Sequence, residues 1–262
     1  MSKPFERFFK PRRNQEISLS EEGGIRYLHF GTVWIQGAMR IDDPYHLELD
    51  YTRDLFAGLL IQPQPRDFTL VGLGAGSVTK FAWKRIPRAR VTTVELAESV
   101  IACARAHFAL PHESTRMRTV CDDGLAYLAA HPDSCDYLIV DAYDAAAKGP
   151  VLSSPEFYAH CRSALRCDRV SVLAVNLFGK HRSFSLNIPN IYKAFDGRML
   201  VLPATARGNV IALGIVGPTV ELEMTALHAR AAALKEATGL AFPTLLAGLR
   251  KANSLTGPTL EI

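Results

Sequence analysis

Between Phe68 and Asp144, short apolar segments alternate with stretches of helical spacing, and glycine or acidic residues follow each apolar segment. This alternation constrains the fold more than any other feature of the chain. It predicts an α/β architecture built on a doubly wound, mostly parallel sheet with right-handed crossovers. Ligands of such sheets bind outside the carboxyl ends of the strands, so we expect the glycine and acidic residues to meet in one crevice.

The pattern predicts strands at 67–73, 90–95, 116–121, 135–141 and 170–177, and helices at 76–86, 97–108, 123–131, 154–166 and 182–195. Two more apolar runs, at 198–203 and 209–215, are joined by a short turn, which predicts an antiparallel edge of the sheet. Residues 219–251 have helical character and are expected to cover one face.

The region before the sheet has a different character. Residues 1–23 are polar and basic and are expected to form a disordered tail. The alternation over Ile25–Arg40 predicts a small β-hairpin. Asp42-Asp43-Pro44 then predicts the start of a helix that ends at Pro63. The expected divisions are therefore the tail, a hairpin and helix, and a main domain (1–23, 24–62 and 63–262).

The first apolar segment leads into a glycine loop, Gly72-x-Gly74-x-Gly76. Glycine lets the backbone turn tightly and approach a ligand, although Ser77 stands where the dinucleotide fingerprint has a further glycine. Glu95 ends the second strand, 21 residues after Gly74, where a carboxylate accepts the hydroxyls of a ribose. The alternative is a tight turn and a surface glutamate. The glycine loop together with Glu95 predicts a Rossmann-like nucleoside-binding catalytic domain.

Acidic residues also follow the third and fourth strands. Asp122-Asp123-Gly124 either caps the next helix or accepts a hydrogen bond from the amine of a base. Asp141 and Asp144, with Tyr143 between them, are the expected catalytic residues. A carboxylate at the mouth of a crevice can act as a general base or hold an ammonium group. The alternative is an Asx-turn at the strand end.

Composition argues against several other classes of protein. The net charge of +4 is mild and lies partly in the basic tail, and no basic stripe interleaved with aromatic residues is present, so no nucleic-acid partner is expected. No apolar run could span a bilayer, so no membrane partner is expected. The eight histidines and five cysteines show no ligand spacing, which predicts no metal. The cysteines are expected to be buried free thiols in a cytoplasmic protein.

Taken in order, these motifs and Ser154-Pro-Glu-Phe-Tyr158 resemble the spermidine synthase (polyamine aminopropyltransferase) family, over residues 25 to 216. The resemblance implies a class I methyltransferase-like Rossmann domain behind a small N-terminal β-domain. It also implies transfer of the aminopropyl group of decarboxylated S-adenosylmethionine to putrescine or a related amine. Methylthioadenosine would be released, and no cofactor would be tightly bound.

The resemblance assigns roles to individual residues. Gln36 would lie beside the methylthioadenosine moiety, Glu95 would bind the ribose and Asp123 the adenine amine. Asp141 would be the general base that helps deprotonate and orient the attacking amine, and Asp144 would hold the far part of the site. The other residues expected to bind the nucleoside are Gly72, Gly74, Gly76, Asp122 and Gly124.

Two departures from the family pattern concern the amine side of the site. Ala75 stands where the family's glycine loop usually has an aspartate that holds the amino end of the aminopropyl group. Tyr51-Thr52-Arg53 stands where the family has Tyr-His-Glu. An arginine that faced a diamine would repel it. The nucleoside half of the site is therefore kept, while part of the amine half is lost.

Three functions follow from these observations. The first is an aminopropyltransferase-like enzyme acting on a small-molecule amine. The second is a small-molecule methyltransferase, because loss of the loop carboxylate would let the site accept ordinary S-adenosylmethionine. The third is a catalytically silent nucleoside-binding protein. The apolar hairpin face with Trp34 and Ile35 also predicts self-association as a homodimer.

Overall fold

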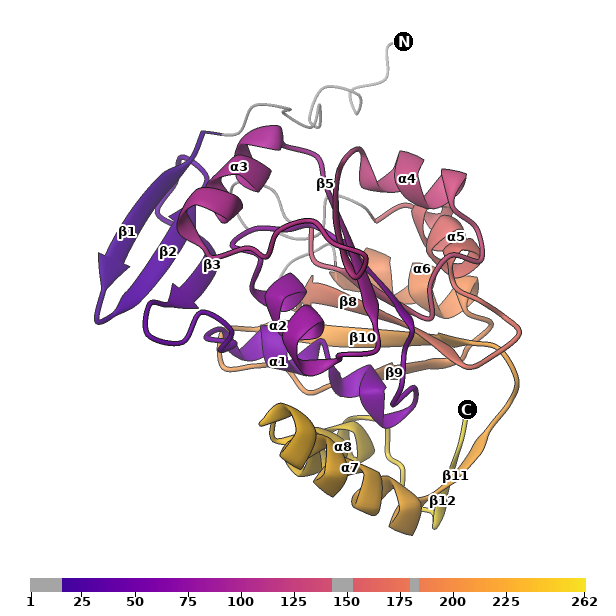
Figure 1. Cartoon of the computed structure of the whole chain (residues 1–262). Helices are drawn as coiled ribbons and strands as arrows, with labels where there is room; N and C mark the ends of the chain where they lie inside the picture. The colour runs from indigo at the N-terminus through magenta and orange to yellow at the C-terminus, as the bar shows by residue number, and fades with distance from the viewer. Residues whose placement is uncertain (1–15, 143–152, 180–183) are drawn as a thin grey trace.

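The computed structural model describes residues 16–142, 153–179 and 184–262. A seven-stranded sheet with the order β6-β5-β4-β7-β8-β10-β9 forms its centre (Figure 1). The neighbouring pairs from β6 to β8 are parallel, and β10 runs antiparallel to both β8 and β9. The predicted doubly wound, mostly parallel sheet is confirmed, and its antiparallel strand lies one place inside the edge.

The strands of this sheet are β4 Asp67–Val71, β5 Arg90–Glu95, β6 Met117–Cys121, β7 Tyr137–Val140, β8 Ser171–Phe178, β9 Met199–Val201 and β10 Asn209–Val216. The helices between them are α2 Ser77–Arg85, α3 Glu98–His107, α4 Gly124–Ala130, α5 Pro155–Ala164 and α6 Phe184–Ala194. Every element predicted for this part of the chain is present, and the ends differ by two residues or fewer within the described ranges.

Helices cover both faces of the sheet. One face carries α2, α3 and two C-terminal helices, α7 Met224–Thr238 and α8 Phe242–Ala252. The other face carries α4, α5 and α6. The stretch predicted to be helical over 219–251 is interrupted, because Gly239 ends α7 with a positive φ. A short strand, β11 Glu221–Glu223, precedes α7 and pairs with β12 Thr259–Glu261.

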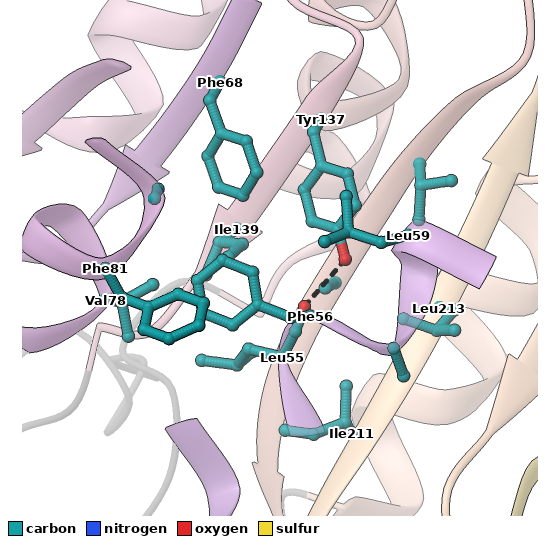
Figure 2. Packing of buried hydrophobic residues seen from close by; sticks show 14 of the residues in the cluster. Leu55, Phe56, Leu59, Phe68, Val78, Phe81, Tyr137, Ile139, Ile211 and Leu213 are labelled. Carbon is teal, nitrogen blue, oxygen red and sulfur yellow. Dashed lines mark hydrogen bonds between the residues drawn. The ribbon is translucent and has the colours of Figure 1, made fainter. Parts of the chain in front are cut away.

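The segment before the sheet packs into the first face. It comprises α1 Asp50–Asp54 and a 3₁₀ turn, η1 Ala57–Leu60. Leu55 and Phe56, between them, are fully buried. The Phe56 ring lies 4.7 Å from that of Phe81, and the Tyr137 hydroxyl donates a 2.8 Å hydrogen bond to the Leu55 carbonyl (Figure 2). These contacts fix α1 on the sheet.

The helix predicted to begin at Asp42 begins at Asp50 instead. The carbonyl of Asp43 accepts a hydrogen bond from the backbone N–H of His46 at 3.0 Å, and its carboxylate accepts one from that of Tyr45 at 3.3 Å. Asp43-Pro44 therefore forms a turn that satisfies its own backbone groups. The residues that read as a helix cap serve this turn.

A second sheet of three antiparallel strands precedes the main domain (β1 Ser18–Glu22, β2 Ile25–His29 and β3 Ile35–Arg40). The predicted hairpin is β2 and β3. The strand β1 lies within the stretch predicted to be a tail, so that prediction is wrong for Ser18–Glu22. Gly23 and Gly24 turn the chain with positive φ, and Arg26 forms a 2.6 Å ion pair with Glu21. Cross-strand charge pairs of this kind stabilise polar strands.

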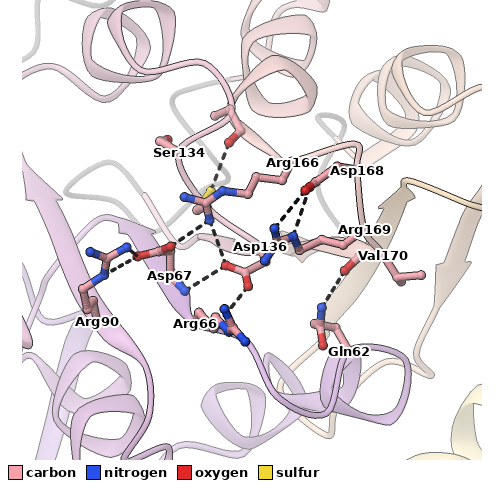
Figure 3. A network of polar contacts seen from close by, with 12 residues as sticks. Gln62, Arg66, Asp67, Arg90, Ser134, Asp136, Arg166, Asp168, Arg169 and Val170 are labelled. Atoms are coloured by element: carbon pink, nitrogen blue, oxygen red, sulfur yellow. Dashed lines mark hydrogen bonds and ion pairs between the residues drawn. The ribbon is translucent and has the colours of Figure 1, made fainter.

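A network of charged residues lies at the amino ends of the central strands (Figure 3). The Asp136 carboxylate, 1% exposed, accepts backbone N–H groups from Arg66 at 2.9 Å and Asp67 at 2.8 Å. Arg166 pairs with Asp67 at 2.8 Å and with Asp136 at 3.2 Å. Arg90 pairs with the other oxygen of Asp67 at 2.6 Å. The network joins β4, β5, β7 and the segment before β8.

Two further predictions concern the whole chain. No helix in the described ranges has the length and apolar character needed to cross a bilayer. The cysteines are free thiols. Cys135 and Cys161 are buried as predicted, whereas Cys121 and Cys167 are exposed, because one lies at the open end of a strand and the other in a loop.

Candidate active site

The glycine loop lies against the end of β7. Gly72, Gly74 and Gly76 have φ values of +100°, +52° and +69°, in the left-handed region that favours glycine. A Cβ atom at Gly72 would overlap the backbone carbonyl oxygen of Asp141. Gly72 therefore allows the ends of β4 and β7 to approach each other.

Strand β3 covers the same loop. A Cβ atom at Gly74 would lie 3.1 Å from the carbonyl oxygen of Gln36. The hydroxyl of Ser77, at the start of α2, donates a 2.8 Å hydrogen bond to the carbonyl of Ala38. The N-terminal sheet thus brings Gln36 beside the loop, although 36 residues separate it from Gly72 in the chain.

Ala75 faces this strand. Its side chain is 2% exposed, and a Cβ atom at Gly37 would lie 2.5 Å from the Cβ of Ala75. The loop position where the family usually has an aspartate therefore holds a methyl group packed against a glycine. A longer side chain at position 75 would require β3 to move.

Glu95, at the end of β5, accepts hydrogen bonds from the loop. Its Oε2 accepts the backbone N–H of Leu73 at 2.9 Å, and Oε1 accepts that of Ala97 at 3.0 Å. Burial raises the pKa of this carboxyl group, and the backbone donors oppose that rise. The backbone N–H groups of Leu96 and Gly74 also act on this carboxylate, so a bound ribose would share its roughly four acceptor positions with the loop.

Asp122 and Asp123 follow β6 beside Glu95, whose carbonyl accepts the backbone N–H of Asp122 at 3.0 Å. Asp123 caps α4 by accepting the N–H of Ala126 at 3.0 Å, and Asp122 accepts the N–H of Asp123 at 2.8 Å. The capping alternative is confirmed for Asp123. Each bond uses Oδ1, and the described residues give the Oδ2 atoms no hydrogen bond. Gly124 is buried in the first turn of α4.

Asp141 is half-buried at the end of β7, where its backbone N–H continues the ladder with the carbonyl of Val71 at 2.9 Å. Its Oδ1 accepts a 2.8 Å hydrogen bond from Nδ2 of Asn176. Burial raises the pKa of Asp141 to about 6, while hydrogen bonds from Asn176 and Tyr51 act in the opposite direction. A carboxylate with this pKa is mostly ionised at neutral pH and can accept a proton.

The contacts form a continuous series along the carboxyl ends of the strands. They run from Asp122 to Glu95, then through the glycine loop to Asp141. The predicted residues Tyr143 and Asp144 lie outside the described residues, as does the segment up to residue 152.

Arg53 does not point its charge at Asp141. Its guanidinium donates to the carbonyls of Leu47 and Glu48, both at 2.9 Å, and pairs with Asp50 at 3.2 Å. The guanidinium is therefore bound to the segment before α1 and to the first residue of that helix.

Asn176 was not predicted as a site residue. It lies on β8 and is 1% exposed, and its Oδ1 accepts a 3.0 Å hydrogen bond from Nδ2 of Asn209. The signal in the sequence was a lone amide among the apolar residues that follow Ser171 in β8. Such a group needs partners when buried.

Comparison with known proteins identifies the family of this chain. The family model of the spermine/spermidine synthase domain matches residues 51–199. A polyamine aminopropyltransferase from Neisseria meningitidis serogroup A is 34% identical over 243 residues, which cover 92% of each chain. One from Chromobacterium violaceum is 33% identical over 261 residues, which cover 99% of each chain.

The fold has relatives among solved structures. A probable spermidine synthase from Corynebacterium glutamicum superposes with a TM-score of 0.69 at 20% identity, covering 94% of this chain and 86% of that one. At this identity the likeness concerns the fold alone. It agrees with the predicted Rossmann-like domain behind a small N-terminal sheet.

Proposed function

This chain belongs to the spermine/spermidine synthase family, and we propose that it transfers an aminopropyl group from decarboxylated S-adenosylmethionine to a small amine with Asp141 as the general base. The coarser statement, an aminopropyltransferase-like enzyme, follows from the family match and the named relatives. The observation that carries the finer proposal is the position of Asp141. It lies against the glycine loop and accepts hydrogen bonds only from uncharged donors among the described residues.

The proposed reaction needs positioning and one proton acceptor. The sulfonium of the donor makes the adjacent carbon of the aminopropyl group electrophilic. The amine nitrogen attacks that carbon, a C–N bond forms, and the C–S bond breaks with its electron pair moving to sulfur. Methylthioadenosine then leaves. The attacking amine must lose a proton, which Asp141 accepts, because its carboxylate is ionised but has a raised pKa.

The nucleoside half of the proposed site uses the remaining strand ends. Gln36 and the glycine loop would contact the methylthioadenosine moiety, and Glu95 would accept the ribose hydroxyls. The Oδ2 atoms of Asp122 and Asp123 would be available to the adenine amine. Asp144 keeps its predicted role on the amine side, Tyr143 stays a predicted catalytic residue, and a homodimer stays a prediction.

The second candidate is a methyltransferase that uses ordinary S-adenosylmethionine. The buried methyl group of Ala75 favours it, because no carboxylate at that loop position selects for the amino end of the decarboxylated donor. The carboxylate of ordinary S-adenosylmethionine would meet no negative charge there.

Calorimetry separates the candidates. We expect methylthioadenosine and decarboxylated S-adenosylmethionine to bind the purified protein more tightly than S-adenosylhomocysteine. Incubation with decarboxylated S-adenosylmethionine and a panel of di- and monoamines should release methylthioadenosine, which chromatography detects. Tighter binding of S-adenosylhomocysteine would favour the methyltransferase, and binding without turnover of any amine would favour the silent homologue.

A further inference from the structure

A chain of two amides leads from Asp141 into the sheet. Asn176 donates from Nδ2 to Oδ1 of Asp141 at 2.8 Å, and Asn209 donates from Nδ2 to Oδ1 of Asn176 at 3.0 Å. Asn176 is 1% exposed. Both polar ends of its amide are therefore used by the protein, as a buried amide requires.

The strand register explains how these residues meet. Val140 of β7 lies opposite Val175 of β8, so the next residues, Asp141 and Asn176, are neighbours at the carboxyl ends of parallel strands. The antiparallel strand β10 then places Asn209 opposite Phe178. The three side chains come from three adjacent strands.

Asn209 is itself held by its backbone. Its N–H donates to Oγ1 of Thr205 at 3.1 Å, and its carbonyl accepts the N–H of Thr205 at 2.8 Å. The turn before β10 therefore fixes the position from which the Asn209 side chain donates.

The negative charge of Asp141 determines the direction of the hydrogen bonds in this series of amides. An ionised carboxylate can only accept, so Asn176 must present its NH₂ group to Asp141 and its carbonyl to Asn209. Asn209 must then donate. The reverse direction would place the carbonyl oxygen of Asn176 against the carboxylate, which is favourable only when Asp141 is protonated.

Resting on the proposed function, we propose that Asn176 and Asn209 are positioning residues that hold Asp141 ionised and oriented to accept the proton of the attacking amine. Asn209 acts through Asn176, because it fixes which end of that amide faces the base. Among the described residues, Tyr51 on α1 is the titratable group that acts on the pKa of Asp141, and it also donates to the carboxylate. Gly72, from the loop on the other side, has no side chain.

Asn209→Asp tests the direction of the hydrogen bonds from Asn209 through Asn176 to Asp141, with almost no change in side-chain shape. The introduced carboxylate can only accept, so Asn176 must turn its NH₂ group away from Asp141. We expect the acidic limb of the kcat/KM profile to move upward by about one pH unit, since a hydrogen bond to the charged form is replaced by one to the neutral form. Turnover at pH 6 should fall about fivefold and largely recover at pH 9.

Asn176→Leu removes the donor at similar volume, and it should move the acidic limb in the same direction. Asn190→Asp is the charge-matched control, because Asn190 on α6 donates to the carbonyl of Ser153 and not to the chain of amides. It should leave the limb in place. Methylthioadenosine affinity should stay within about threefold in all three variants. If the acidic limb of the kcat/KM profile stays at its wild-type pH in both Asn209→Asp and Asn176→Leu, the proposal is overturned.

A readout that needs no turnover separates this proposal from the proposed function. The carboxyl ¹³C signal of Asp141, assigned through Asp141→Asn, can be titrated by NMR in the unliganded protein. Its midpoint should be higher in Asn209→Asp than in wild type. If no amine reacts but the midpoint moves, the proposed function fails and the positioning role stands. If amines react and the midpoint is unchanged, the positioning role fails.

Discussion

Both ends of the central sheet carry carboxylates, but the described residues pair only those at the amino ends with arginines. Asp67 and Asp136 form ion pairs with Arg90 and Arg166 (Figure 3). At the carboxyl ends, no ion pair of the described residues involves the four predicted acids, Glu95, Asp122, Asp123 and Asp141. Their partners are backbone amides and neutral side chains.

The difference separates two uses of the same residue type. A buried carboxylate paired with arginine has its charge compensated within the protein. A carboxylate held by neutral donors keeps its net charge available to a ligand, and desolvation raises its pKa. The amino ends of the strands therefore stabilise the sheet, whereas the carboxyl ends can hold hydroxyls, an amine or a proton.

The largest expected effect is on chemistry at the carboxyl ends. Asp141→Asn should lower kcat by about 10²–10⁴-fold, because the amide cannot take a proton from the amine. Calorimetry should show methylthioadenosine affinity within a few fold of wild type. Unchanged turnover would show that Asp141 is not the base.

The next effect concerns stability at the amino ends. Asp136→Asn removes one of the two carboxylates that pair with Arg166 and weakens two backbone bonds to a buried group, so we expect a loss of about 1–3 kcal/mol in the free energy of unfolding. Urea denaturation measures it. Asp168→Asn, in an exposed pair with Arg169, is the control and should leave the midpoint unchanged. Equal midpoints for both variants would contradict a structural role for Asp136.

Activity and stability should change in opposite directions with pH, because both depend on the protonation of Asp141. The folded-state pKa of Asp141 is about 6, above the ordinary value of 3.8. Its protonated form is therefore favoured by folding, and that contribution to stability is lost as the pH rises from about 4 through about 6. The unfolding free energy of wild type relative to Asp141→Asn should fall over this window. Catalytic rate should rise over the same window, because the base must be ionised. Parallel changes in the two quantities would contradict the assignment.

The smallest effect is expected from Arg53. Its guanidinium pairs with Asp50 and with backbone carbonyls, so Arg53→Ala should change the KM for the amine by no more than about twofold. Steady-state kinetics over a range of amine concentrations measures it. A tenfold lower KM would show that Arg53 repels the acceptor after all.

The sequence predicted the regular part of the molecule well, because apolar spacing and turn residues act locally. The strands and helices from Asp67 to Ala194 were predicted from such signals, and so was the series of acids at the strand ends. The turn at Asp43 was misread as a helix cap, since Asp before Pro favours both. The strand β1 was missed because its residues are exposed and polar, and cross-strand pairing alone identifies it.

The contacts that tune the site could not be predicted in this way. Asn176 lies 35 residues from Asp141 and 33 from Asn209, and the three meet only because β10 inserts antiparallel beside β8. The burial of Ala75 depends on how the N-terminal sheet docks on the loop. Both facts follow from the order of strands in space, which local spacing does not specify.

The docking of β3 on the glycine loop also has a consequence for synthesis of the chain. The hydrogen bond from Ser77 to Ala38 spans 39 residues, so the first sheet leaves the ribosome before the surface that covers it exists. Small sheets without a packing partner are marginally stable in water. We expect nascent chains that stop before Gly72 to be cut by protease throughout residues 18–40, and longer chains that include α2 to be protected. The first strands to be made would thus become resistant only after the glycine loop and α2 have followed them.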